Sequence, residues 1–223
     1  MYKGQNIIEN NNTYSRERNS ILQNTYLLLS MTIIFSSIMS LLSAFFSIKP
    51  MNPLINLISC LVIISLLNKN KDNAQGIFYC FLFTGFLGWT LGPILNFYLR
   101  ILNNGSEILI ISLISTGLSV LGLSIIGSLN KDYSRMQSFI FTGSLVCISA
   151  VFVNLFIRIN FLFLSLSIMT SLISGCLLII QTNKVIYGGE NNYIIATTNI
   201  YMSIFNLFSN ILYFSSVFLG ERE

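Results

Sequence analysis

The stretch ILIISLISTGLSVLGLSIIGSL at residues 108–129 contains no charged side chain, and its only polar side chains are small hydroxyls. A helix needs about 20 mainly apolar residues to cross the hydrocarbon core of a bilayer. The strands of a membrane barrel would instead alternate between polar and apolar residues within segments of about ten. The stretch therefore predicts a transmembrane helix.

The composition of the whole chain agrees with this prediction. Hydrophobic residues make up 53% of the 223 positions, charged residues only 9%, and the mean hydropathy is +0.73. Soluble domains carry roughly 25% charged residues, so this chain has too little charge to cover a globule in water. We expect the lipid bilayer to surround most of it. The net charge of +4 is modest and does not indicate a nucleic-acid partner.

Six other apolar runs resemble the one at 108–129. The run that follows Pro50 is short at its apolar core, so a re-entrant segment is the alternative to a full crossing there. Proline suits the first turn of a helix, and we expect Pro50 to open this one. A polar loop is expected at residues 181–195. The predicted spans are 25–48, 51–67, 76–99, 108–129, 138–157, 161–180 and 196–219.

The predicted fold class is all-α integral membrane, with a seven-transmembrane helix bundle at residues 25–223. Residues 1–24 are polar and cannot bury enough apolar surface to fold alone, so they are expected to form a cytoplasmic tail. This tail also lacks the early apolar core of a cleavable signal peptide.

The basic residues favour one orientation. Seven crossings place the termini on opposite faces, and an N-terminus in the cytoplasm puts eight of the twelve basic residues inside. This distribution fits the positive-inside rule. We therefore expect a multi-pass protein of a bacterial inner membrane with a cytoplasmic N-terminus and a periplasmic C-terminus. The inner set is Lys3, Arg16, Arg18, Lys69, Lys71, Lys131, Arg135 and Lys184, and the outer set is Lys49, Arg100, Arg158 and Arg222.

The sequence offers no arrangement typical of an enzyme. All eight carboxylates lie in tails, turns or span ends, and the absence of histidine removes the commonest general base and metal ligand. Neither an HExxH nor a GxSxG motif occurs. Four cysteines lie in apolar runs without CxxC spacing and are expected to act as small hydrophobes, with a metal or disulfide role as the alternative. We expect no catalytic residue, cofactor or metal site. The cysteines are Cys60, Cys80, Cys147 and Cys176.

Polar residues follow one face of the last predicted span. Asn199, Ser203, Asn206 and Asn210 recur at helical spacing, and Gln181 at the end of the sixth span is an expected neighbour. Hydrocarbon offers polar groups no partner, so this face must point into the bundle. It either forms hydrogen bonds between helices or lines a polar cavity.

Small residues form a face in the third predicted span. Gly85, Gly88 and Gly92 lie on one side of the helix and allow another helix to approach closely. Pro93 removes a backbone donor and should kink the helix. Close packing with a bend is one interpretation, and a gating hinge is the other.

Three motifs carry a resemblance to a known family. They are NTYLLLSMT at 24–32, GFLGWTLGP at 85–93 and GGENNYIIAT at 188–197. Together they resemble the Bax inhibitor-1 family, most closely its YccA-type branch, whose members modulate the FtsH protease. The third motif supplies the residues of a family loop, Gly188, Gly189, Glu190, Asn192 and Tyr193.

The resemblance implies a bundle of seven helices around a central one, and direct association with FtsH that spares membrane substrates such as SecY. The polar tail would then face the cytoplasmic ring of FtsH. Other family members are described as pH-sensitive calcium leak channels with a pair of aspartates as the sensor. The matching positions here are Gln181 and Ser203, which cannot ionise, so a pH switch is in doubt.

Two hypotheses follow. The first is a modulator that binds FtsH, and the second is a cation leak channel with an impaired pH sensor. The lack of ionisable groups at depth argues against the second, because such groups mark ion paths in membranes. The sequence carries no signal for the oligomeric state.

Overall fold

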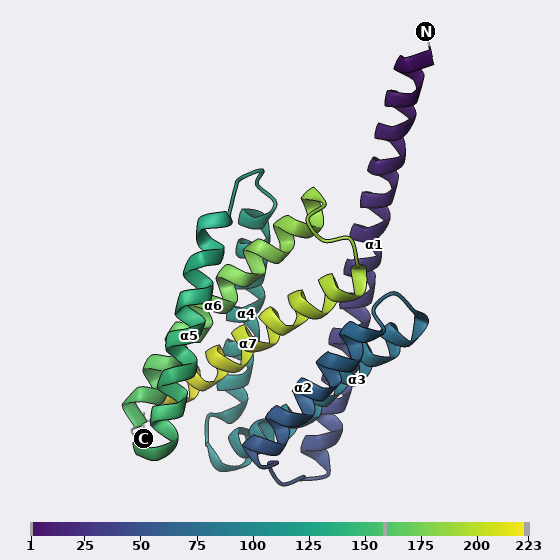
Figure 1. Cartoon of the computed structure of the whole chain (residues 1–223). Helices are drawn as coiled ribbons and strands as arrows, with labels where there is room; N and C mark the ends of the chain where they lie inside the picture. Colours follow the sequence, from purple (N-terminus) through teal and green to yellow (C-terminus); the bar gives the residue numbers. More distant parts are fainter. Residues whose placement is uncertain (1, 158–159, 221–223) are drawn as a thin grey trace.

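The computed structural model describes residues 2–157 and 160–220, and every element in these ranges is an α-helix (Figure 1). The outer surface of the bundle suits lipid rather than water. Six helices are long and apolar enough to cross a bilayer, and α2 is a shorter apolar helix. The helices are α1 (Tyr2–Phe45), α2 (Pro53–Lys69), α3 (Ala74–Ile101), α4 (Gly105–Gly127), α5 (Ser134–Ile157), α6 (Asn160–Tyr187) and α7 (Tyr193–Gly220).

The ends of the helices differ from the sequence prediction, most of all in α1 and α6. Helix α1 begins at Tyr2, so the polar segment before residue 25 continues the first span as helix. Helix α6 extends to Tyr187 and α7 starts at Tyr193, which leaves a loop at 188–192. The predicted loop at 181–195 was wrong because polar residues continue the helix beyond its apolar part.

Helix α2 also starts later than predicted. Pro53, not Pro50, occupies its first turn, and the Asn52 side chain caps it by accepting a hydrogen bond of 3.0 Å from the Leu54 amide. Its 17 residues rise about 25 Å, less than the roughly 30 Å of a bilayer core. A full crossing by this helix stays a prediction.

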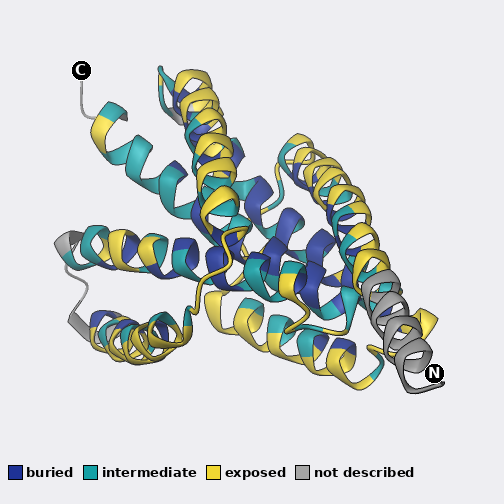
Figure 2. Ribbon diagram, turned by 90° about the horizontal axis from the view of Figure 1, so that it is seen from above, coloured by how far each residue is buried: buried dark blue, intermediate teal, exposed yellow. Residues whose placement is uncertain are grey.

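Helix α7 lies at the centre of the arrangement. It packs against α1, α3, α4 and α6, while α2 lies outside α3 and α5 outside α6. Between Tyr193 and Leu219, only Met202 and Phe218 are exposed. Figure 2 shows buried residues gathered where the helices face one another and exposed residues over the outer surfaces. The central helix implied by the resemblance is therefore α7.

The outward faces of α4 and α5 are covered by large apolar side chains. Leu118 and Ile125 on α4 are both 66% exposed, and Phe141 on α5 is 68% exposed. Contiguous apolar surface of this extent marks contact with a membrane or a partner. We therefore expect the outward faces of α4 and α5 to contact lipid.

The glycine face of α3 packs directly on α1. A Cβ atom on Gly88 would overlap the Ser36 carbonyl oxygen, and one on Gly92 would overlap the Ser43 side chain. At Gly85 the added atom would meet the ring of Phe35. The three glycines thus let the two backbones approach more closely than any larger residue would permit.

Pro93 lies inside α3 and the helix continues through it to Ile101. Because proline has no amide hydrogen, the carbonyl of Trp89, four residues earlier, loses its partner within the helix. The Ser43 hydroxyl of α1 donates to this carbonyl at 2.8 Å. A neighbouring helix therefore satisfies the group that the proline leaves free.

We expect Gly88→Ala to destabilise the protein by about 1–3 kcal/mol, because the methyl group collides with the α1 backbone rather than with a movable side chain. Denaturant unfolding in mixed micelles, followed by the fluorescence of the single tryptophan, measures the change. Gly117→Ala is the control, since no heavy atom lies within 4 Å of the added carbon. Equal losses in the two variants would contradict close packing at Gly88.

Candidate functional site

The polar face predicted on the seventh span lies on α7 with none of its members exposed. The Asn210 side-chain oxygen accepts hydrogen bonds from Thr170 at 3.1 Å and from Ser167 at 3.5 Å, both on α6. Ser203 is 3% exposed and donates to the Asn199 carbonyl of its own helix at 3.0 Å. Asn206 is half-buried. Hydrogen bonding between helices thus occurs at the Asn210 end of this face.

Gln181 lies within α6, not at its end as predicted. Its side chain is half-buried, and in the described part of the chain no hydrogen bond joins it to Ser203. Both groups are neutral at every pH. The pair that the resemblance matches to the family's aspartates therefore offers neither a shared proton nor a carboxylate oxygen, which are the chemical basis of a proton switch and of strong calcium binding.

A second polar face of α7 was missed by the sequence analysis. The Tyr201 hydroxyl donates to the Thr84 carbonyl of α3 at 3.2 Å and shares a hydrogen bond with the Ser36 hydroxyl of α1. One turn away, the Thr197 hydroxyl lies 3.1 Å from the Thr25 carbonyl of α1. Tyr201 is 3% exposed and Thr197 is fully buried. These contacts join α7 to the α1–α3 pair on the side opposite to α6.

The family loop at 188–192 is tied to a different loop of the chain. The Asn192 amide group donates to the Lys71 carbonyl and to the Asp72 carboxylate, both at 3.0 Å. Its oxygen accepts from the amides of Ile194 and Ile195 and so caps α7. Asn192 therefore joins the start of α7 to the turn between α2 and α3.

The two glycines of the loop end α6. Gly188 has a positive φ of 81°, a conformation that favours glycine, and the Gly189 amide donates to the Lys184 carbonyl at 2.7 Å. The Glu190 carboxylate accepts a hydrogen bond from the backbone amide of Asn192 at 3.1 Å. Tyr193 is the first residue of α7, and its side chain is half-buried. All five residues of the predicted family loop thus shape the connection between α6 and α7.

The last turns of α6 are also joined to the loop between α4 and α5. The Asn183 amide group donates to the carbonyls of Gly127 and Leu129, at 3.1 and 3.0 Å. The Tyr187 hydroxyl donates to the Ser128 carbonyl at 2.7 Å. These bonds give partners to carbonyls at and just beyond the end of α4, where the helix itself supplies fewer. Three loops at one end of the bundle are therefore connected by side-chain hydrogen bonds.

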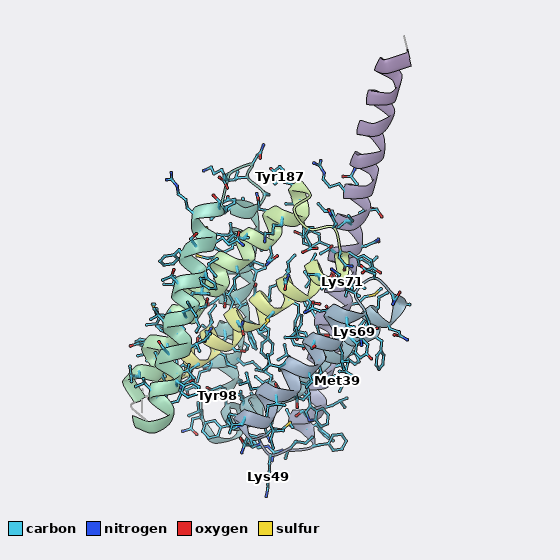
Figure 3. The ribbon with its side chains drawn as sticks, viewed as in Figure 1. Met39, Lys49, Lys69, Lys71, Tyr98 and Tyr187 are labelled. Carbon is cyan, nitrogen blue, oxygen red and sulfur yellow. The ribbon has the colours of Figure 1, made fainter. Side chains whose placement is uncertain are left out.

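Charged groups lie at the ends of the helices. Lys69 and Lys71 lie, with Tyr187, in the part of the bundle nearer the N-terminus, and Lys49 lies at the opposite end (Figure 3). The Asp132 carboxylate accepts hydrogen bonds from the amide and hydroxyl of Ser134, which lowers its pKa. It therefore keeps its charge, and its cap on α5, to a lower pH than a free aspartate does.

The described residues offer little for catalysis or metal binding. All four cysteines are free thiols, and no group of three histidine, cysteine or carboxylate residues in these ranges could hold a metal. The polar groups inside the bundle are hydroxyls and amides, which hold helices together and do not transfer protons at neutral pH.

The helical bundle, its apolar surface and its neutral interior define a multi-pass membrane protein. The chain belongs to the family described as inhibitor of apoptosis-promoting Bax1, whose model matches residues 18–222. This confirms the resemblance seen in the sequence motifs. The members are membrane proteins rather than enzymes, and this chain is not an enzyme.

Relatives match nearly end to end. An uncharacterized protein of Pseudomonas aeruginosa is 38% identical, covering 92% of this chain and 93% of the relative. An uncharacterized membrane protein of Vibrio cholerae is 34% identical over 88% of both chains. The protein named modulator of FtsH protease YccA, from Escherichia coli K12, is 33% identical over 86% of this chain and 87% of its own length.

We expect Asn192→Ala to release the start of α7 from the α2–α3 turn. The variant loses a helix cap and the bonds to Lys71 and Asp72, so the free energy of unfolding should fall by about 1–2 kcal/mol. Hydrogen exchange at Ile194 and Ile195 should also become faster. Asn191→Ala is the control, because Asn191 is exposed and makes no hydrogen bond within the described residues. Unchanged exchange in Asn192→Ala would rule out the cap.

Proposed function

We propose that the chain binds the FtsH protease in the bacterial inner membrane and restrains its proteolysis. The observation that carries this proposal is the 33% identity to the protein named modulator of FtsH protease, which extends over 86% of this chain. The same relative in another Escherichia coli strain is named an inner membrane protein. A match over this length includes the three loops connected by side-chain hydrogen bonds as well as the membrane spans.

The arrangement of the chain supports an interaction outside the bilayer as well as within it. Helix α1 runs for 44 residues and projects well beyond the other helices (Figure 1). About 20 residues suffice to cross the membrane, so the first half of α1 is free to reach a protein at the membrane surface. The cytoplasmic ring of FtsH is the partner that we propose for it.

The orientation in this proposal places the N-terminus in the cytoplasm and the C-terminus in the periplasm. Arg18, Lys71 and Lys184 belong to the end of the bundle where the three loops are connected, and their charge favours the cytoplasmic side. The projecting part of α1 then lies on the same side as the ring of the protease.

A cation leak channel is the weaker alternative. The carboxylates with described side chains lie in loops or, for Glu107, in the first turn of α4. The interior groups are neutral and mostly engaged in hydrogen bonds between or within helices. Membrane ion pathways normally depend on charged or clustered oxygen ligands at depth, so these contacts favour a binding protein.

The proposal is tested by measuring the half-life of unassembled SecY in cells that contain or lack this protein. We expect a shorter half-life without it, since FtsH would no longer be restrained, and we expect FtsH to co-purify with the tagged chain. The control repeats the pulse-chase in cells depleted of FtsH, where the difference should vanish. Identical half-lives with and without the protein, together with no co-purification, would overturn the proposal.

A further inference from the structure

A continuous groove opens on the side of the bundle between α4 and α6, with α7 as its floor. Two cavities of about 330 and 440 Å³ share Ser171, Leu172 and Ile211 and therefore form one depression, here called the α4–α6 groove. Its residues come from the middle parts of α4 and α6. The groove thus lies at the depth of the hydrocarbon core.

The groove begins where the close contact between α4 and α6 ends. A Cβ atom on Gly127 would lie 2.8 Å from the Ile179 carbonyl oxygen of α6, and one on Gly175 of α6 would lie 3.3 Å from the Leu123 Cδ1 atom of α4. Gly122 of α4 lines the groove, and no heavy atom lies within 4 Å of a Cβ placed on it. The two helices therefore touch at the Gly127 end, and the groove is open beside Gly122.

Both walls carry pairs of small residues at the spacing that supports close helix packing. Ser115 and Ser119 are four residues apart on α4, and Ser171 and Gly175 are four apart on α6; all but Gly175 also carry a hydroxyl. Small residues at this interval let helices approach closely in membranes, where interhelical hydrogen bonds and van der Waals contacts drive association. The two pairs do not pack against each other, because both face the same open groove.

The wall hydroxyls also lack partners. Ser115, Ser119 and Ser171 on the walls, and Ser215 on the floor, make no hydrogen bond within the described ranges, although all four line the groove. On the same helices, the hydroxyls of more buried neighbours donate to their own backbone, as Ser112 does at 2.6 Å and Ser174 at 2.8 Å. Lipid tails offer no hydrogen-bond partner at this depth. An occupant with polar groups fits the groove better than an acyl chain does.

We propose that the α4–α6 groove receives a transmembrane helix of the protease complex. The inference rests on the proposed function and assigns the surface within the membrane through which the association occurs. The convex ridges of this chain carry large apolar side chains such as Leu118 and Phe141, which cannot pair with the wall hydroxyls. A helix with small or hydroxyl-bearing residues, supplied by the partner, can approach both walls and pair with them.

Filling the groove tests this surface. Ser119→Leu and Ser171→Leu add bulk inside the groove, and we expect co-purification of FtsH from solubilised native membranes to fall about tenfold, the effect of roughly 1.4 kcal/mol. Ser149→Leu is the matched control, because Ser149 is exposed on α5, away from the groove. Tryptophan fluorescence in detergent should show that all three variants remain folded.

The outcomes separate the two proposals. Co-purification that persists in the folded groove variants overturns the groove surface and leaves the association with FtsH intact. If the wild-type chain does not co-purify with FtsH, the proposed function fails and the groove assignment fails with it.

A photo-crosslinker identifies the occupant directly. Benzoylphenylalanine in place of Leu172, which is 62% exposed at the groove, should give an adduct with a transmembrane peptide of the FtsH complex after irradiation of native membranes. The same probe in place of Ile148 on α5, 61% exposed, is the control and should give lipid adducts only. Adducts with lipid alone, or with a second copy of this chain, at position 172 would overturn the proposal.

Discussion

The contact of α7 with the α1–α3 pair is the constraint on which the rest of the bundle depends. Glycines on α3 bring its backbone against α1, and Ser43 of α1 satisfies the Trp89 carbonyl that Pro93 leaves free. The pair then presents the Ser36 hydroxyl and the Thr84 carbonyl to Tyr201. Because lipid supplies no competing partner, these neutral bonds orient the central helix.

The contact with α1 and α3 positions α7. The opposite face of α7 and its first residues then determine where α6 and the loops lie. Asn210 accepts hydrogen bonds from α6, and Asn192 joins the start of α7 to the α2–α3 turn. From α6, Asn183 extends the connection to the end of α4. The result is a neutral bundle held by side-chain hydrogen bonds, which suits a protein that presents surfaces to a partner better than one that moves ions.

Much of this arrangement was predictable from sequence, because lipid imposes a simple pattern on each span. Apolar run length located the seven helices, and glycine spacing located the α3 face. The loop predicted at 181–195 was too long, because polar residues such as Asn183 continue α6 and pair with carbonyls at the end of α4. The Tyr201 contacts were missed for a related reason: their partners lie on helices far away in the sequence, and one chain alone does not reveal such pairs.

A double-mutant cycle between Tyr201 and Ser36 tests the central contact most directly. The free energies of unfolding of Tyr201→Phe, Ser36→Ala and the double variant, measured in mixed micelles, give the coupling between the two hydroxyls. The structure predicts a favourable coupling of about 0.6–1.7 kcal/mol, the range found for hydrogen bonds between membrane helices. Additive effects, with no coupling, would contradict the account that this bond holds α7 against α1.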